Sequence, residues 1–182
     1  VAAVGAYGFP RHGLQSFPAA THPFQTVVLL IALASLLYGS VMAFTQTNVR
    51  LIAGYSSIAQ LGFITAGIFA LRTDGSDGAI LQMVNHGLVV APLFVIVAIL
   101  YERTGTEDLR RMGGMATKAP VLAALFLIVA LATLAMPGSA HFIGEFALPH
   151  GLVQAKIGLA VVAIRGRRMA GYPTPPPPPA TE

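Results

Sequence analysis

Long apolar runs separated by short polar connectors dominate the chain. Three of them contain no charged residue and are long enough to cross a bilayer as helices, which takes about 20 largely apolar residues: 24–45, 51–71 and 78–101. A fourth run, 119–136, meets a Pro137-Gly138 pair, which interrupts a regular helix. The pattern predicts an all-α, polytopic transmembrane helix bundle of about four full spans plus partial ones, including one discontinuous helix.

Both ends of the chain differ from this central pattern. Residues 1–9 resemble the end of a helix, and since the sequence opens on Val1 without an initiator Met we interpret it as a fragment. The apolar run 157–164 is too short to cross a bilayer. We expect the bundle to occupy residues 1–164 and the basic, proline-rich residues 165–182 to form a disordered tail.

Composition agrees with a membrane protein. Charged residues make up 10% of the 182 residues and hydrophobic ones 55%, whereas soluble domains have about 25% and 45–50%. The net charge of +4 comes from basic residues placed between apolar runs, which indicates topology signals and not nucleic-acid contacts. Because the sequence contains no cysteine, disulfides and thiolate-bound clusters are excluded, and we expect no redox chemistry in this chain.

The distribution of Lys and Arg predicts the orientation, because cytoplasmic loops of membrane proteins carry an excess of both. One side would carry eight basic residues: Arg50, Arg103, Arg110, Arg111, Lys118, Arg165, Arg167 and Arg168. The other side would carry three: Arg11, Arg72 and Lys156. We therefore predict that the long charged loop 102–118 is cytoplasmic.

Glu145 is the first candidate for chemistry, because an ionisable side chain inside apolar sequence is costly in a membrane and is by default a functional-site hypothesis. It follows the Pro137-Gly138 break in the run AMPGSAHFIGEF. Broken helices tolerate irregular backbone and water at membrane depth, so Glu145 could load and release protons there. The alternative is a carboxylate at the membrane interface. His141, one turn earlier on the same face, is an auxiliary candidate.

The third apolar run carries a polar face made by Gln82, Asn85 and His86. His86 lies about 12 Å along this run, close to the bilayer centre. Imidazole titrates near neutral pH and can pass a proton between its two nitrogens, which makes His86 a candidate relay, with core packing as the alternative. Since no second His or carboxylate stands at metal-ligand spacing, we expect no metal site.

The second apolar run contains the polar stripe GYSSIAQLGF. Ser56 and Gln60 lie four residues apart on one helical face, with Tyr55 and Ser57 beside them. These side chains are candidates for a hydrogen-bonded proton path. Ser and Gln also commonly hydrogen-bond neighbouring helices in membranes, and this structural use is the alternative.

Five motifs occur in the order and spacing of one known family: GAYGF, YGSVMAFTQTNVRLIAGYSSIAQLGF, GAILQMVNHGL, LYERTGTEDLRRMGG and ATLAMPGSAHFIGEF. Over about residues 1–155 the chain resembles the antiporter-like membrane subunits of proton-pumping NADH:quinone oxidoreductase, respiratory complex I, of the chain M or mitochondrial chain 4 type. The resemblance implies a fold of two inverted helical repeats, of which this sequence would hold the second. It also implies that Glu145 matches the terminal proton-carrying glutamate of the discontinuous helix and His86 the histidine of a central hydrophilic axis.

The resemblance further implies a function, partners and cofactors. The chain would be a proton-translocating subunit that couples quinone reduction elsewhere in the enzyme to proton transfer, in a bacterial plasma membrane. Its partners would be other membrane subunits and the lipid bilayer, with no nucleic acid. NADH, flavin, iron–sulfur clusters and quinone would be bound by other subunits, and this chain would hold no cofactor.

The sequence departs from the family at three positions. The family usually has Lys just before GAYGF, where Ala2 and Ala3 stand, and many members have His at the position of Gln60 and Asn at the position of His141. Two alternatives therefore stay open. One is a subunit of a multi-subunit cation/proton antiporter, which shares much of the motif set. The other is a non-translocating structural segment or a defective truncated product.

Overall fold

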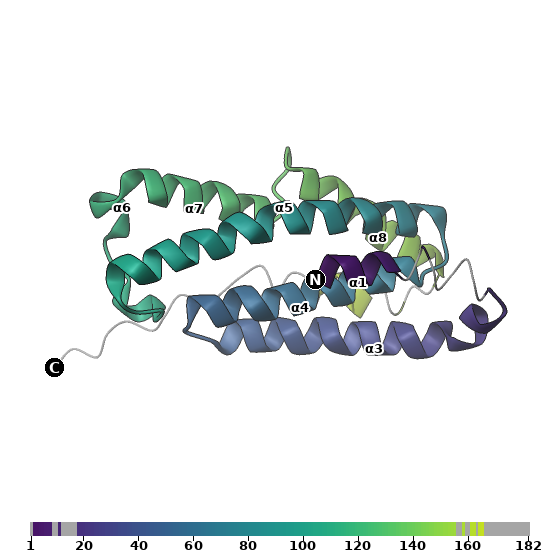
Figure 1. The fold of residues 1–182 in the computed structure, drawn as a ribbon. Helices are drawn as coiled ribbons and strands as arrows, with labels where there is room; N and C mark the ends of the chain where they lie inside the picture. Colours follow the sequence, from purple (N-terminus) through teal and green to yellow (C-terminus); the bar gives the residue numbers. More distant parts are fainter. Residues whose placement is uncertain are drawn as a thin grey trace.

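The computed structural model describes residues 2–8, 11, 18–155, 158, 161, 162, 164 and 165. The helices in this part of the chain are α1 (Ala2–Gly8), α3 (Pro18–Thr45), α4 (Val49–Ile68), α5 (Thr73–Thr104), the 3-10 turn η2 (Leu109–Arg111), α6 (Met115–Lys118), α7 (Pro120–Thr133) and α8 (Ala140–Ala155). The described residues form no strand beyond a single bridge between Asn48 and Asp108. The all-α bundle predicted from the sequence is confirmed (Figure 1).

Within the described residues, three helices are long and apolar enough to cross a membrane: Pro23–Thr45 in α3, Val49–Ile68, which is α4, and Gly75–Thr104 in α5. They correspond to the first three predicted spans. The connector before the third span is shorter than the apolar pattern suggests, because Thr73 to Asp77 already belong to α5. Its polar residues from Thr73 to Asp77 form the first turns of that helix.

The predicted discontinuous helix is present as α7 and α8, which follow one another along α5 (Figure 1). The first half ends at Thr133, four residues before Pro137, whose missing N–H cannot satisfy the Thr133 carbonyl. Within the break, Ala135 and Gly138 have positive φ angles of 51° and 100°. The backbone therefore leaves helical geometry between residues 134 and 139 and re-enters it in α8.

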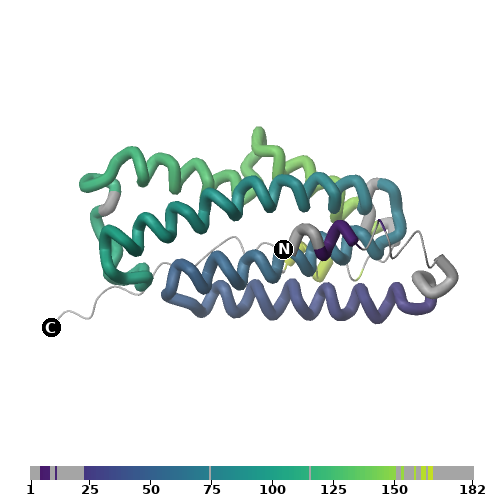
Figure 2. The backbone as a smooth tube through the Cα atoms, viewed as in Figure 1, coloured from purple at the N-terminus to yellow at the C-terminus, as the bar shows by residue number. Residues whose placement is uncertain are grey.

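Glycines allow close packing between α3 and α4. A Cβ on Gly39 would lie 2.7 Å from the Ala59 nitrogen, and one on Gly62 would lie 2.6 Å from the Ala32 carbonyl oxygen. In membranes, where lipid is as apolar as leucine, small residues at helix interfaces permit the close contacts that drive association. These two glycines hold α3 and α4 together as an antiparallel pair, which Figure 2 traces in blue and violet.

Helix α8 enters the bundle at a fully buried leucine. Leu148 packs onto Gly67 of α4, with its Cγ 2.6 Å from where a Cβ would stand, and its backbone nitrogen lies 2.8 Å from the Cβ position of Gly78 on α5. Both glycines leave room that only a hydrogen atom can occupy. The second half of the broken helix is thereby held against α4 and α5 together.

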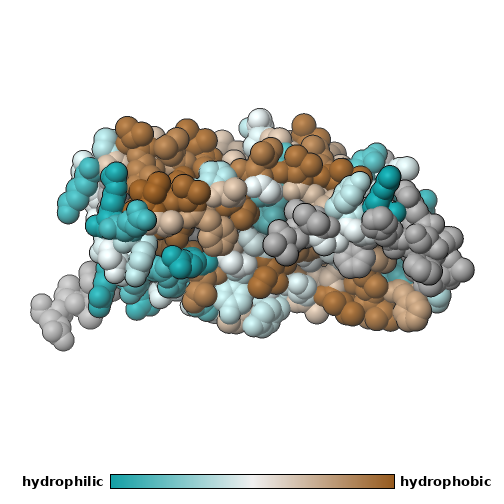
Figure 3. Space-filling view, viewed as in Figure 1, coloured by the Kyte–Doolittle hydropathy of each residue, from teal (hydrophilic) through white to brown (hydrophobic). Residues whose placement is uncertain are grey.

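The outer surface is largely apolar. Large exposed hydrophobic side chains include Leu30, Ile31, Leu88, Val121 and Ile128. Hydrophilic side chains gather at the end of the molecule that carries α6 and the loop before it (Figure 3). In a protein with membrane-spanning helices, such apolar surfaces face lipid or neighbouring helices. The predicted tail 165–182 lies outside the described residues except for Arg165, and so do four of the eight residues of the short apolar run 157–164.

Candidate functional site

The buried polar side chains form a row through the helix interfaces. Apart from Ser40, which donates to the Leu36 carbonyl of its own helix, the buried polar residues in the described part of the chain are Gln60, Gln82, Asn85, His86 and His141. All five were candidates on sequence grounds. They come from three helices, α4, α5 and α8, so the fold gathers residues that are far apart in the chain. We refer to these five residues as the polar row.

The first link of the polar row joins α4 to α5. Gln82 Nε2 donates a hydrogen bond of 3.4 Å to Gln60 Oε1, and the two side chains are 0% and 2% exposed. Two turns away on each helix, a Cβ on Gly67 of α4 would lie 3.1 Å from the Gly75 carbonyl oxygen of α5. Both contacts correspond to one antiparallel register of α4 against α5. Because buried amides are costly unless they are hydrogen-bonded, this pair is expected to fix the register of the two helices.

Helix α8 adds the second link of the polar row. The Oε1 atom of Gln82 lies 2.5 Å from where a Cβ on Gly144 would stand, so the carboxamide rests directly on the α8 backbone. The antiparallel register of these helices, which also pairs Gly78 with Leu148, places Asn85 level with His141 one turn further on. Polar groups therefore continue from α5 onto the helix that carries Glu145.

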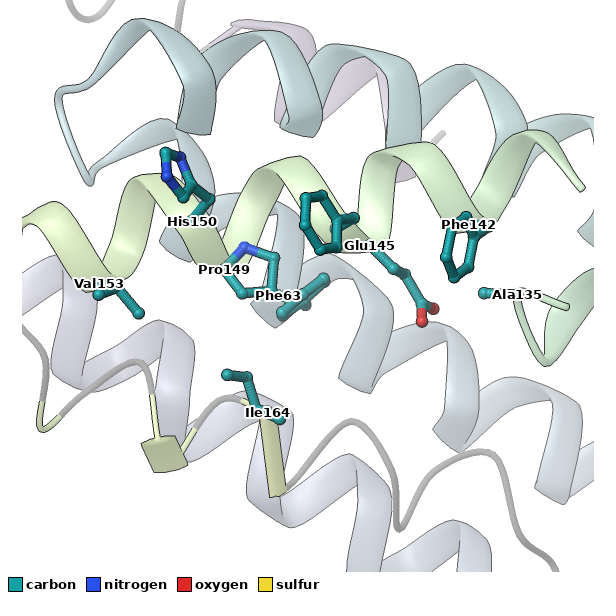
Figure 4. A pocket seen from close by; sticks show the side chains of 9 residues that line it. Phe63, Ala135, Phe142, Glu145, Pro149, His150, Val153 and Ile164 are labelled. Carbon is teal, nitrogen blue, oxygen red and sulfur yellow. The ribbon is translucent and has the colours of Figure 1, made fainter. Parts of the chain in front are cut away.

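Glu145 follows Gly144 and is half-buried. Its carboxyl group lines a cavity of about 460 Å³. The other lining residues are mostly apolar: Phe63, Ala135, Phe142, Phe146, Pro149, His150, Val153 and Ile164. Figure 4 shows the carboxyl group pointing from α8 toward the side of Phe142 and Ala135, whereas the His150 ring lies on the opposite side of the helix. A carboxyl group thus meets an apolar cavity beside the helix break.

Pro149 gives the Glu145 backbone an unusual environment. A proline inside a helix has no N–H and therefore cannot donate to the carbonyl four residues earlier, which here is the Glu145 carbonyl. The Pro149 side chain also lines the cavity. Both the side chain and the main chain of Glu145 can therefore offer oxygen atoms in a region that otherwise is apolar.

The other predicted residues of α4 lie outside the polar row: Tyr55, Ser56 and Ser57, whose hydroxyl donates to the Ala53 carbonyl at 2.9 Å. Tyr55 packs edge-to-face on Tyr38 of α3, with the ring centroids 6.2 Å apart. The Ser56 hydroxyl is half-buried and donates to the Ala53 carbonyl of its own helix at 3.2 Å. The α4–α5 register nevertheless places Ser56 level with His86. In this structure Tyr55 packs on a neighbouring helix, whereas the Ser56 hydroxyl bonds the backbone of its own helix.

Gly144 was not among the predicted site residues, although it lies within the motif ATLAMPGSAHFIGEF. The available signal is an isolated glycine inside a helical segment, which commonly has a packing or functional reason. His150 also lines the cavity, although its side chain is exposed. Among the described residues, no group of three His, Cys, Asp or Glu side chains is placed to hold a metal ion.

Comparison with known proteins relates this geometry to one family. The family model described as NADH:quinone oxidoreductase/Mrp antiporter, TM, matches residues 1–169. NADH-quinone oxidoreductase subunit M from Rickettsia prowazekii is 38% identical over 163 residues, which is 90% of this chain and 33% of that protein. The chain therefore spans about a third of the length of the curated relatives it matches.

Solved structures agree with this similarity. A chain of respiratory complex I from Thermus thermophilus with bound NADH superposes with a TM-score of 0.88 and 32% identity, covering 92% of this chain and 36% of that one. A chain of the Mrp complex from Dietzia sp. DQ12-45-1b has the same fold, with a TM-score of 0.76 and 24% identity, over 81% of this chain and 28% of that one.

Proposed function

The chain belongs to the NADH:quinone oxidoreductase/Mrp antiporter transmembrane family, is an integral membrane protein, and we propose that it is part of a proton-translocating subunit of NADH:quinone oxidoreductase. One observation carries the proposal: the polar row from Gln60 to His141 leads to the helix whose carboxylate, Glu145, lines a cavity at a helix break. Ionisable and polar residues at membrane depth commonly mark ion pathways and proton relays.

The residues of this site differ in what they can do. His86 and Glu145 can bind and release a proton, whereas the amides of Gln60, Gln82 and Asn85 can only orient and hydrogen-bond what passes between them. His141, the buried member of the polar row on α8, is a second imidazole that could hold a proton. We assign to Glu145 the exchange of protons with one side of the membrane and to His86 the transfer along the row.

Quinone reduction would take place in other subunits and act on this site through charge. A change of charge at one end of a row in a low-dielectric interior alters the affinity of the next group for its proton. NADH, flavin, iron–sulfur clusters and quinone are assigned to those other subunits, and the lipid bilayer and further membrane subunits are the partners of this chain. The proposed location is the bacterial plasma membrane, with loop 102–118 on the cytoplasmic side.

A cation/proton antiporter subunit is the second candidate. The description of the matching family names Mrp antiporters as well, and the fold shared with the Mrp complex supports this candidate. Sodium-dependent growth of a deletion strain would favour it over the oxidoreductase. A purely structural or defective segment would give neither ion flux nor assembly into a complex.

The proposal is tested by Glu145→Gln in the full-length subunit, measured in native membrane vesicles. Because glutamine keeps the shape of the side chain but cannot release a proton, proton uptake per NADH oxidised should fall while reduction of an artificial electron acceptor by NADH is unchanged. Glu102→Gln, the same change on an exposed side chain at the end of α5, is the matched control and should pump normally. Unchanged proton-to-electron stoichiometry in Glu145→Gln would refute the proposed role.

A further inference from the structure

We propose that Gly144 is a positioning residue: because it has no side chain, the Gln82 carboxamide can pack directly on the α8 backbone. We call this contact the Gly144 seat. Through it, Gln82 connects α4 and α5 to α8, the helix that carries Glu145. This inference rests on the function proposed above and adds a residue that carries no chemistry of its own. The inference concerns how the polar row reaches Glu145, which directly follows Gly144 in the chain.

The contact between the two residues is closer than a side chain would allow. A Cβ at position 144 would stand 2.5 Å from Gln82 Oε1 and 3.4 Å from both the Cβ and the backbone nitrogen of Gln82. The first distance is below any that a real Cβ makes, and the atom concerned is the end of the Gln82 side chain, whereas the α5 backbone nitrogen is at ordinary contact distance. An alanine at 144 would therefore have to displace the carboxamide by about 1 Å, a shift of the size that costs about 10²-fold in rate when a reacting group is misplaced.

The other end of the same carboxamide is fixed. Gln82 is fully buried, and its Nε2 donates to Gln60 Oε1 on α4. The carboxamide is hydrogen-bonded to α4 at its nitrogen and packed against α8 at its oxygen, so a movement away from α8 strains the bond to Gln60. Gln82 thus joins three helices through one functional group.

The seated oxygen has unused hydrogen-bonding capacity. Gln82 Oε1 is buried and accepts no hydrogen bond within the part of the chain that the structure describes, and the same holds for Asn85 Nδ2 as a donor, one turn along α5. A buried acceptor without a donor costs about 1–3 kcal/mol, so such groups are rare in native structures and call for an explanation. In the proposed path, this oxygen is the acceptor that α5 presents to α8 next to Glu145.

The glycine itself is not favoured by local structure. Glycine inside a helix is less favourable than alanine by about 0.5–1 kcal/mol, so helix propensity alone would favour alanine at 144. Gly87 on α5 gives the comparison, because a Cβ there would meet nothing within 4 Å. The close approach of Gln82 is therefore the specific reason for a glycine at position 144.

The experiment uses the full-length subunit in the assembled complex in membrane vesicles. We expect Gly144→Ala to lower proton uptake per electron at least about tenfold while NADH oxidation by an artificial acceptor persists, and Gly87→Ala to behave as the parent protein. Gln82→Asn in the Gly144→Ala background shortens the side chain by one methylene and should restore part of the pumping. Gln82→Ala in that background removes the clash but also the amide, so it should restore assembly without restoring pumping.

Equal recovery of pumping by the Asn and Ala suppressors would overturn the inference, since the contact would then serve packing alone. Gln82→Met by itself keeps the length of the side chain without the amide, and normal pumping in that variant would overturn the inference even where Gly144→Ala fails to assemble. Loss of pumping in Glu145→Gln together with normal pumping in Gly144→Ala would refute only the positioning role of Gly144. Normal pumping in Glu145→Gln refutes the proposed function instead.

Discussion

The Arg50 guanidinium lies 2.7 Å from the Glu107 carboxylate, across the two loops that close one end of the bundle. The other carboxylate oxygen of Glu107 accepts a bond of 2.8 Å from Asn48 Nδ2, and its backbone carbonyl accepts from the Val49 nitrogen at 3.0 Å. A second backbone hydrogen bond joins the same two segments: the Leu109 nitrogen donates to the Thr47 carbonyl at 3.0 Å. Residues 47–50 and 107–109 thus form a clip between the start of α4 and the loop that follows α5.

Removal of the Glu107 carboxylate should loosen this clip locally. Arg50 is about half exposed, so the ion pair adds little to the stability of the clip. Because Glu107→Ala also removes the hydrogen bond to Asn48, we expect this variant to lose about 1 kcal/mol of local stability. The expected result is faster tryptic cleavage after Arg110 or Arg111 in membranes, because the loop opens more often. Glu102→Ala, on an exposed residue of α5, is the control, and equal cleavage rates in the two variants would contradict the clip.

The glycines between α3 and α4 should be intolerant of any side chain. Gly39→Ala and Gly62→Ala each place a methyl group under 3 Å from backbone atoms of the partner helix, and overpacking of this kind costs about 1–3 kcal/mol. We expect a lower melting temperature of the detergent-solubilised protein and less of it in the membrane.

Gly54→Ala is the matched control for that prediction. Gly54 lies on α4, as Gly62 does, and a Cβ there would meet nothing within 4 Å. Since alanine favours helix by up to about 1 kcal/mol over glycine, this variant should be as stable as the parent or slightly more so. A similar loss of stability in all three variants would mean that the close approach of α3 and α4 is not the cause.

At position 60, the Gln60–Gln82 contact should tolerate only side chains that can accept a hydrogen bond from the Gln82 amide N–H. Gln60→His supplies a ring nitrogen as acceptor and should keep pumping near the parent level, whereas Gln60→Met leaves the buried Gln82 amide N–H without a partner, at a cost of about 1–3 kcal/mol. Proton uptake per electron in vesicles measures the difference. Equal pumping by the His and Met variants would show that the polar connection between α4 and α5 is dispensable.

Much of the site follows from local sequence. Gln82, Asn85 and His86 share one face of a helix because their spacing is fixed by 3.6 residues per turn, and they are buried as a group. Tyr55 and Ser56 belong to a stripe of the same kind, yet they make packing contacts outside the polar row. A stripe shows that polar groups lie together, but only the neighbouring helix decides which of them it covers.

The sequence by itself determined the spans and the break, because hydropathy and the Pro137-Gly138 pair act within a few residues of themselves. It also singled out Glu145, since a carboxylate in apolar sequence is conspicuous without any partner. The tertiary structure alone decided that Gln82 rests on Gly144 and that Glu107 meets Arg50. These partners are more than 50 residues apart in the chain, and the register between two packed helices depends on which side chains fit together across the interface. The hydropathy pattern along the sequence does not specify that fit.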